Sequence, residues 1–122
     1  MANATTIIPF SASTQGKAIK VAATATAGTT IHVTGTSATI VDRLYLWAQN
    51  NHTADVVVTV ECGGVASPDN LIINTVPFKS GLVQLVDGQP LLGSGSVALT
   101  VGVFAGTTNV VSIYGYVLRV VP

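Results

Sequence analysis

The chain has 122 residues, of which 48% are hydrophobic and only 8% are charged, and its formal net charge is zero. A soluble domain of ordinary composition carries about a quarter of its residues as Asp, Glu, Lys or Arg, so Thr, Ser, Asn and Gly must cover most of this surface. A surface with so little charge neither steers charged ligands nor keeps copies apart. We therefore expect a component of an assembly and not an enzyme.

Length and composition exclude several other classes. The length suits one domain with its own core. A single cysteine, Cys62, excludes an intramolecular disulfide and is expected to act as a small core residue beside Val58 and Val60. The longest apolar stretches are too short to span a membrane, the start of the chain lacks the features of a signal peptide, and the five Lys and Arg are scattered singly. We expect no contact with membrane or nucleic acid.

Thr, Val, Ile and Gly dominate the chain and favour strands over helices. Turn signals separate the apolar segments at the spacing of sandwiches and barrels. The predicted strands are residues 17–25, 30–34, 40–49, 55–62, 71–76, 82–86, 97–105 and 110–120. We predict an all-β, two-sheet antiparallel sandwich, jelly-roll-like, over residues 17–122, with an eight-stranded closed barrel as the alternative.

Residues 1–16 do not follow the strand pattern. One apolar patch, Ile7, Ile8 and Phe10, lies among Ser, Thr, Ala and Asn. A frayed terminus is one interpretation. The other is an extended N-terminal arm whose apolar patch docks on a neighbouring subunit.

The titratable residues match no catalytic, metal-binding or phosphate-binding motif. Alternation within its strand predicts that His32 lies on an exposed face. We expect no catalytic residues, metal or cofactor.

Four aromatic residues stand out. Tyr45 and Trp47 share one side of their predicted strand, opposite Leu44 and Leu46, and Tyr114 and Tyr116 share one side of the last strand. Together they could form a flat surface for sugar rings. The alternative, which we favour, is that the rings pack in the sandwich or at a subunit interface.

Two stretches carry a resemblance. Residues 70–83 (NLIINTVPFKSGLV), with the Gly-containing loop after them, and residues 111–119 (VSIYGYVLR) resemble small virion structural proteins of tailed bacteriophages, most of all capsid decoration (cement) proteins. The similarity covers roughly residues 40–120.

The resemblance implies a non-enzymatic protein that binds the outer surface of the assembled capsid and stabilises it. It implies that the partners are the major capsid protein and other copies of this chain, in a possible homotrimer. The chain would then be made in the host cytoplasm and end in the virion. The predicted contact residues are Ile7, Ile8, Phe10, Pro68, Asp69, Asn70, Gln89, Pro90 and Leu91. The alternative is a tail, fibre or knob component that binds a receptor or carbohydrate through Tyr45, Trp47, Tyr114 and Tyr116.

Overall fold

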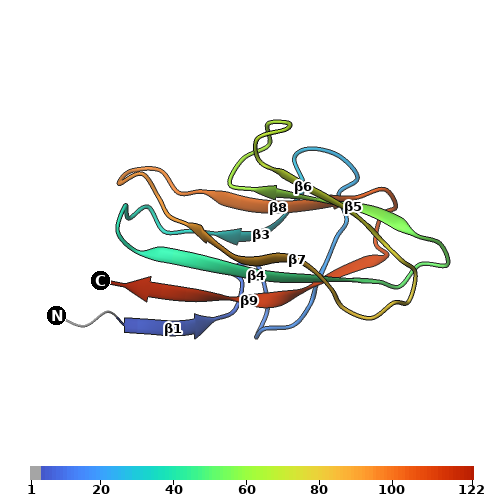
Figure 1. Ribbon diagram of the computed structural model, residues 1–122, viewed down its shortest axis with the longest axis horizontal. Helices are drawn as coiled ribbons and strands as arrows, with labels where there is room; N and C mark the ends of the chain where they lie inside the picture. The colour runs from blue at the N-terminus through green and yellow to red at the C-terminus, as the bar shows by residue number, and fades with distance from the viewer. Residues whose placement is uncertain (1–3) are drawn as a thin grey trace.

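Residues 4–122, the part described by the computed structural model, form nine strands and no helix (Figure 1). All pairs are antiparallel, and the strands lie in two sheets, which confirms the predicted all-β sandwich. The strands are β1 (Ala4–Ile8), β2 (Ile19–Lys20), β3 (Thr29–Val33), β4 (Val41–Asn50), β5 (Val56–Cys62), β6 (Leu71–Val76), β7 (Val83–Leu91), β8 (Thr100–Ala105) and β9 (Val111–Val121).

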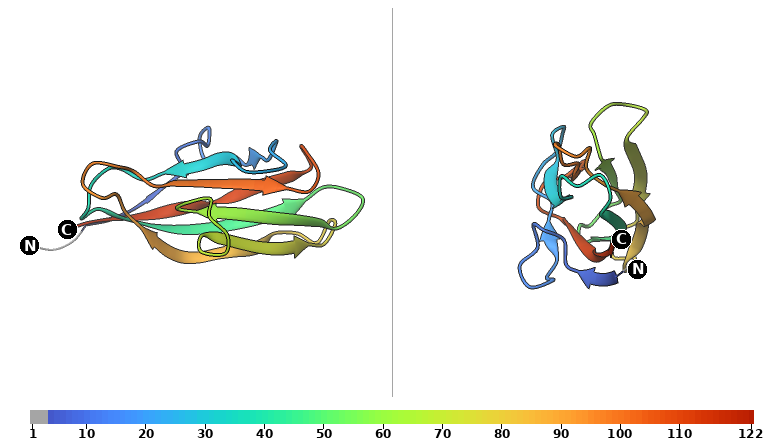
Figure 2. Two further views of the ribbon diagram at one scale, coloured as in Figure 1. Left: turned by 90° about the horizontal axis from the view of Figure 1, so that it is seen from above. Right: turned by 90° about the vertical axis from the view of Figure 1, so that its left-hand side faces the viewer.

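The strand order is that of a jelly roll. The first sheet, sheet A, has the order β1-β9-β4-β7, with β2 also paired to β9, and the second, sheet B, has the order β3-β8-β5-β6. From β3 onward every connection crosses between the sheets except the one joining β5 to β6. Such crossings build the double Greek key of jelly rolls. The two sheets remain separate layers instead of closing into one barrel (Figure 2).

Alternation along the long strands places the core as the sequence predicts. Leu44, Leu46 and Ala48 of β4 point inward and are buried, whereas Tyr45 and Trp47 lie on the outer face of sheet A. In β9, Val111, Ile113 and Val117 likewise point inward, and Tyr114 and Tyr116 lie on the outer face. The buried apolar side chains of both sheets form one cluster: Phe10, Val21, Ile31, Leu44, Leu46, Ala48, Val56, Val58, Val60, Val76, Val86, Leu91, Val101, Val103, Ala105, Val111, Ile113 and Val117.

Three predicted strand boundaries are wrong. In residues 17–25 only Ile19–Lys20 pairs as a strand. The short strand predicted at 82–86 continues to Leu91 as β7, because Gly88, with a φ of 80°, sits in a bulge between the Leu44–Gln89 and Tyr45–Asp87 pairs. The strand predicted from residue 97 begins at Thr100.

The N-terminal segment belongs to its own sandwich. Residues 4–8 pair with β9 at the edge of sheet A, and the chain then crosses to sheet B, where the Ala12 N–H donates to the Ile31 carbonyl. Phe10 is buried in the core, in space left by Gly115, where a Cβ would come within 2.8 Å of the Phe10 ring. The prediction that Phe10 docks on a neighbour is therefore wrong for this conformation.

The prediction that His32 is exposed is also wrong, since its side chain is fully buried. A register shift between Thr30 and His32 in β3 interrupts the alternation, so that Ile31 and His32 are both buried. Bulges break the two-residue period on which the prediction relied.

His32 belongs to a buried polar cluster that joins the two sheets. Its Nε2 lies 2.8 Å from Asp42 Oδ2 on β4, and Arg119 of β9 donates from Nε and Nη2 to the two Asp42 oxygens at 2.8 and 2.9 Å. The Ser11 backbone N–H donates to His32 Nδ1 at 3.1 Å. Because Nδ1 accepts, the ring proton resides on Nε2, which donates to Asp42. We call these three side chains the His–Asp–Arg cluster.

Opposing effects set the ionisation of Asp42. Burial alone would raise the pKa of Asp42, but hydrogen bonds from Arg119 and His32 and the positive charge of Arg119 outweigh it, so this pKa lies below its ordinary value. The hydrogen bond to Asp42 raises the pKa of Arg119. Asp42 is therefore a carboxylate in the folded protein at neutral pH.

Replacing Asp42 should destabilise the fold strongly. In Asp42→Asn the charge facing Arg119 is lost and one amide nitrogen replaces an acceptor oxygen. We expect a loss of about 2–4 kcal/mol at pH 7, toward the lower part of the range for broken buried pairs because Arg119 remains partly exposed. Urea unfolding measures it. The control, Asp87→Asn on an exposed carboxylate, should change stability by less than about 0.5 kcal/mol.

Acidification should remove the same stabilisation. A carboxyl group whose pKa is lower in the folded state stabilises the protein above its unfolded pKa of about 3.9, and the stabilisation is lost as pH falls through the folded value. Urea unfolding from pH 7 to pH 2 should show a decline beginning near pH 4 that is shallower in Asp42→Asn. Equal slopes in both proteins would contradict this assignment.

Candidate functional site

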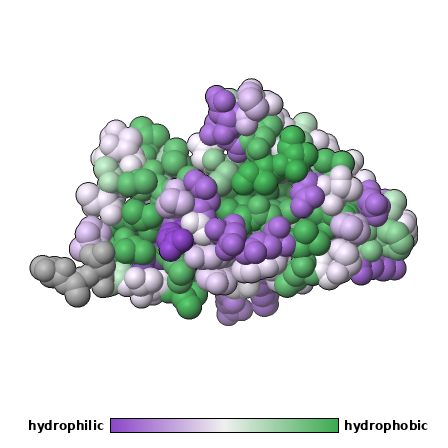
Figure 3. All heavy atoms as spheres, viewed as in Figure 1, coloured by the Kyte–Doolittle hydropathy of each residue, from purple (hydrophilic) through white to green (hydrophobic). Residues whose placement is uncertain are grey.

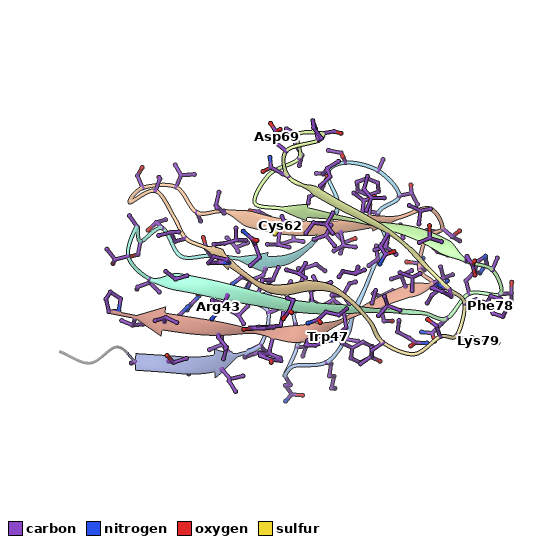
Figure 4. The ribbon with its side chains drawn as sticks, viewed as in Figure 1. Arg43, Trp47, Cys62, Asp69, Phe78 and Lys79 are labelled. Atoms are coloured by element: carbon purple, nitrogen blue, oxygen red, sulfur yellow. The ribbon has the colours of Figure 1, made fainter. Side chains whose placement is uncertain are left out.

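Two of the predicted contact regions meet at one pocket. The loop between β5 and β6 and the end of β7 border a pocket of about 340 Å³ lined by Asp69, Asn70, Gln89 and Leu91, with Cys62 beside them. Figure 4 shows Asp69 on this loop. Pro68 and Pro90 are exposed neighbours in the chain. Ile7 and Ile8, by contrast, lie on β1 at the edge of sheet A, so the predicted contact residues do not form one surface.

Cys62 is the one thiol of the chain and faces the core side of sheet B with Val58 and Val60, as predicted. Burial raises the pKa of the Cys62 thiol. A thiol with a raised pKa carries little thiolate at neutral pH and is a poor nucleophile or metal ligand. Cys62 is therefore a weak nucleophile in the wall of the pocket.

The four aromatic residues come together on the outer face of sheet A. Tyr45 is the cross-strand partner of Tyr116, and Trp47 that of Tyr114. The Tyr45 and Tyr116 rings stack with centroids 5.1 Å apart, and Trp47 lies 6.0 Å from Tyr116. Tyr114 is 41% exposed and the other three rings are partly exposed. The rings are thus outside the core, and we call them the aromatic surface.

A polar border surrounds part of the aromatic surface. Figure 4 shows Arg43 and Trp47 on β4. Arg43 lies next to Tyr45 on the same face and donates from Nε to the Gly88 carbonyl at 3.4 Å, and Gln84 is the cross-strand partner of Trp47. Aromatic rings with polar neighbours suit a ligand that has both an apolar face and hydroxyl groups.

The outer face of sheet B has a different character. Val57, Ile73 and Phe104 surround Thr59, whose cross-strand partners are Ile73 and Phe104. Val57 is 48% and Ile73 62% exposed, whereas Thr59 beneath them is buried. Figure 3 shows apolar side chains over the β5–β6 region and a polar band along β7. We call Val57, Ile73 and Phe104 the apolar face.

The sequence does not reveal the apolar face. The run from Val56 to Val60 is apolar on both sides of the strand, so its pattern does not tell a core residue from an exposed one. Only the pairing of β5 with β6 and β8 assigns Val57 to the outside.

The described strands of sheet B have no exposed charged side chain. Among the described residues, the strands of sheet B carry three ionisable side chains. One is the Cys62 thiol, and the other two, His32 and Glu61, are buried. The exposed charges lie in loops and on sheet A: Lys17, Lys20, Arg43, Asp55, Asp69, Lys79 and Asp87. The apolar face is therefore nearly free of electrostatic steering or repulsion.

The His–Asp–Arg cluster is not arranged to act on a substrate. Both His32 ring nitrogens and both Asp42 oxygens already have hydrogen-bond partners, and both side chains are buried. Over residues 4–122 no group of three or more His, Cys, Asp or Glu is placed to hold a metal ion. The same residues include no helix that could cross a membrane.

No protein-family model matches this sequence, and no curated protein matches it significantly.

Proposed function

We propose that this chain is a non-enzymatic virion structural protein that binds the outer surface of an assembled bacteriophage capsid and stabilises it. The observation that best supports this proposal is the apolar face. Exposed Val57 and Ile73 on a sheet with no exposed charge are suited to burial against another protein surface. The resemblance of residues 40–120 to decoration proteins supports the identity of that partner.

The physical consequence of such binding is stabilisation by linkage. A protein that binds only the assembled shell lowers the free energy of that shell and not of its free subunits. Contacts of modest strength suffice, because they are repeated at every equivalent position of the lattice. Low surface charge suits this role, since neighbouring copies on a crowded shell do not repel one another.

Cosedimentation with capsids of the virus that encodes this chain tests the proposal. We expect saturable binding at a fixed ratio to capsid subunits. The double variant Val57→Thr/Ile73→Thr keeps β-branched side chains but loses apolar area, and should bind at least about tenfold more weakly. The control, Leu82→Thr, changes an equally exposed apolar residue in a loop and should bind normally.

Absence of binding by the unaltered chain would overturn the capsid proposal. Equal binding by the double variant would show that another surface makes the contact. Truncation of residues 1–16 is unsuitable for this test, because it removes Phe10 from the core and the Ser11 and Ala12 hydrogen bonds to β3.

A second candidate function is supported by the aromatic surface. Partly exposed rings on two adjacent strands, with Arg43 and Gln84 at their border, are suited to stacking against sugar rings. On this alternative the chain is a tail, fibre or knob component that binds a carbohydrate receptor.

Titration with purified cell-surface polysaccharide of the host distinguishes the second candidate. Trp47→Ala and Tyr114→Ala should each weaken binding by at least about tenfold if the rings stack on sugars. Phe78→Ala, which removes an exposed aromatic ring from the loop after β6, is the control and should bind normally. Affinity that survives both aromatic substitutions would rule out this surface as the glycan site.

A further inference from the structure

The outer face of sheet B also contains a buried carboxylate. Glu61 of β5 points away from the core, as Thr59 does, yet it is only 3% exposed. The Gly28 backbone N–H donates to Glu61 Oε1 at 2.7 Å. The second oxygen, Oε2, is buried and has no hydrogen-bond partner among residues 4–122. A buried carboxylate with one oxygen that lacks a donor is costly, so a cation from outside the chain that reaches this carboxylate would be favoured.

Glu61 lines a second pocket. The pocket has a volume of about 250 Å³ and lies between the segment before β3 and the loop after β5. Its walls include Ala27, Val65 and Leu99, and its floor is Gly102 of β8. Gly102 is the cross-strand partner of both Thr30 and Glu61. Because glycine has no side chain, a gap remains between the Thr30 and Glu61 side chains on the outer face of the sheet.

Oxygen atoms surround that gap. A Cβ placed on Gly102 would lie 3.0 Å from Glu61 Oε1 and 3.5 Å from each of the Gly28 and Thr29 carbonyl oxygens. One carboxylate and two carbonyl oxygens thus border the space above Gly102, and the wall beside it is apolar. We call this arrangement the Glu61 pocket.

We propose that the Glu61 pocket receives the ammonium group of a lysine side chain presented by the protein on which this chain docks. The inference rests on the proposed function and deepens it by naming the chemistry of the contact. On the described strands of sheet B, the Glu61 carboxylate is the one anionic group of the outer face, so a cation is the complementary charge. The apolar wall suits the methylene stem of lysine.

The acceptor pattern favours ammonium over guanidinium. Arginine pairs with carboxylates through two parallel hydrogen bonds and needs both oxygens. Of the two Glu61 oxygens, Oε1 is the one nearer the gap, 3.0 Å from a Cβ placed on Gly102. An ammonium group has three donors, which match one carboxylate and two carbonyl groups. Because the Glu61 pocket lies next to the apolar face, docking of the partner protein would shield the lysine from water. Shielded charge pairs contribute most to specificity.

The test uses n-butylammonium chloride as a mimic of the lysine side chain, titrated into the full chain and followed by amide NMR shifts. We expect saturable shifts at Gly28 and Gly102 with a Kd of roughly millimolar order. Glu61→Gln has nearly the same shape and keeps an acceptor for Gly28, but it lacks the charge and should bind at least about tenfold more weakly. Gly102→Ala keeps the carboxylate but occupies the gap, and should also lose binding. Asp87→Asn, on an exposed carboxylate of sheet A, should bind like the unaltered chain.

Three results would overturn the lysine assignment. These are the absence of saturable shifts at Gly28 and Gly102, equal shifts with neutral 1-butanol, and equal shifts with potassium chloride at the same concentration. The last result would indicate an inorganic cation. Unchanged amide spectra outside the pocket and an unchanged urea midpoint identify variants that remain folded.

Capsid cosedimentation separates this inference from the proposed function. If capsids bind the unaltered chain and Glu61→Gln equally, the lysine contact is overturned while the decoration function stands. If n-butylammonium binds but capsids do not bind at all, the decoration function is overturned and the pocket remains an amine site. Weaker capsid binding by folded Glu61→Gln, with normal binding by Asp87→Asn, supports both.

Discussion

The carboxylate of Asp42 is the point at which the separate parts of this sandwich are joined. It accepts hydrogen bonds from His32 of sheet B and from Arg119 of sheet A, and the other ring nitrogen of His32 accepts from the Ser11 backbone. Three strands and the N-terminal crossing thereby meet through one buried cluster. Hydrophobic burial drives the sheets together but is non-directional, whereas this cluster has one geometry that satisfies every group. We infer that it specifies the alignment of the sheets.

The few charged residues of this chain are distributed unevenly between the core, the loops and the two sheets. Of the ten charged side chains, Asp42 and Glu61 are buried and Arg119 is half-buried in its pair with Asp42. The exposed charges lie in loops and on sheet A. As a result the two outer faces differ: sheet A presents aromatic rings with polar neighbours, and sheet B presents apolar side chains beside a buried carboxylate. One small fold therefore offers two chemically distinct surfaces, and the two proposed partners correspond to them.

The N-terminal segment shows how context changes the meaning of an apolar patch. Ile7, Ile8 and Phe10 are close together in the sequence but lie in different environments, because Ile7 and Ile8 are on β1 and Phe10 follows the end of that strand. Ile7 is exposed at the sheet edge, Ile8 is partly buried, and Phe10 fills the space above Gly115 in the core. Only Ile7 remains free to contact a neighbour, so the segment contributes to the stability of its own domain before it contributes to any assembly.

The sequence by itself determined the all-β class, the inward and outward faces of β4 and β9 and the scarcity of surface charge, because these depend on composition and on a two-residue period that is local. It did not determine the strand order, since pairing in a jelly roll joins segments far apart in the chain. It misplaced His32 and the end of β7, because each lies at a bulge that interrupts the period. The Glu61 pocket and the exposure of Val57 were decided only by tertiary structure. Both depend on which strands lie beside β5, and an apolar run carries no information about its neighbours.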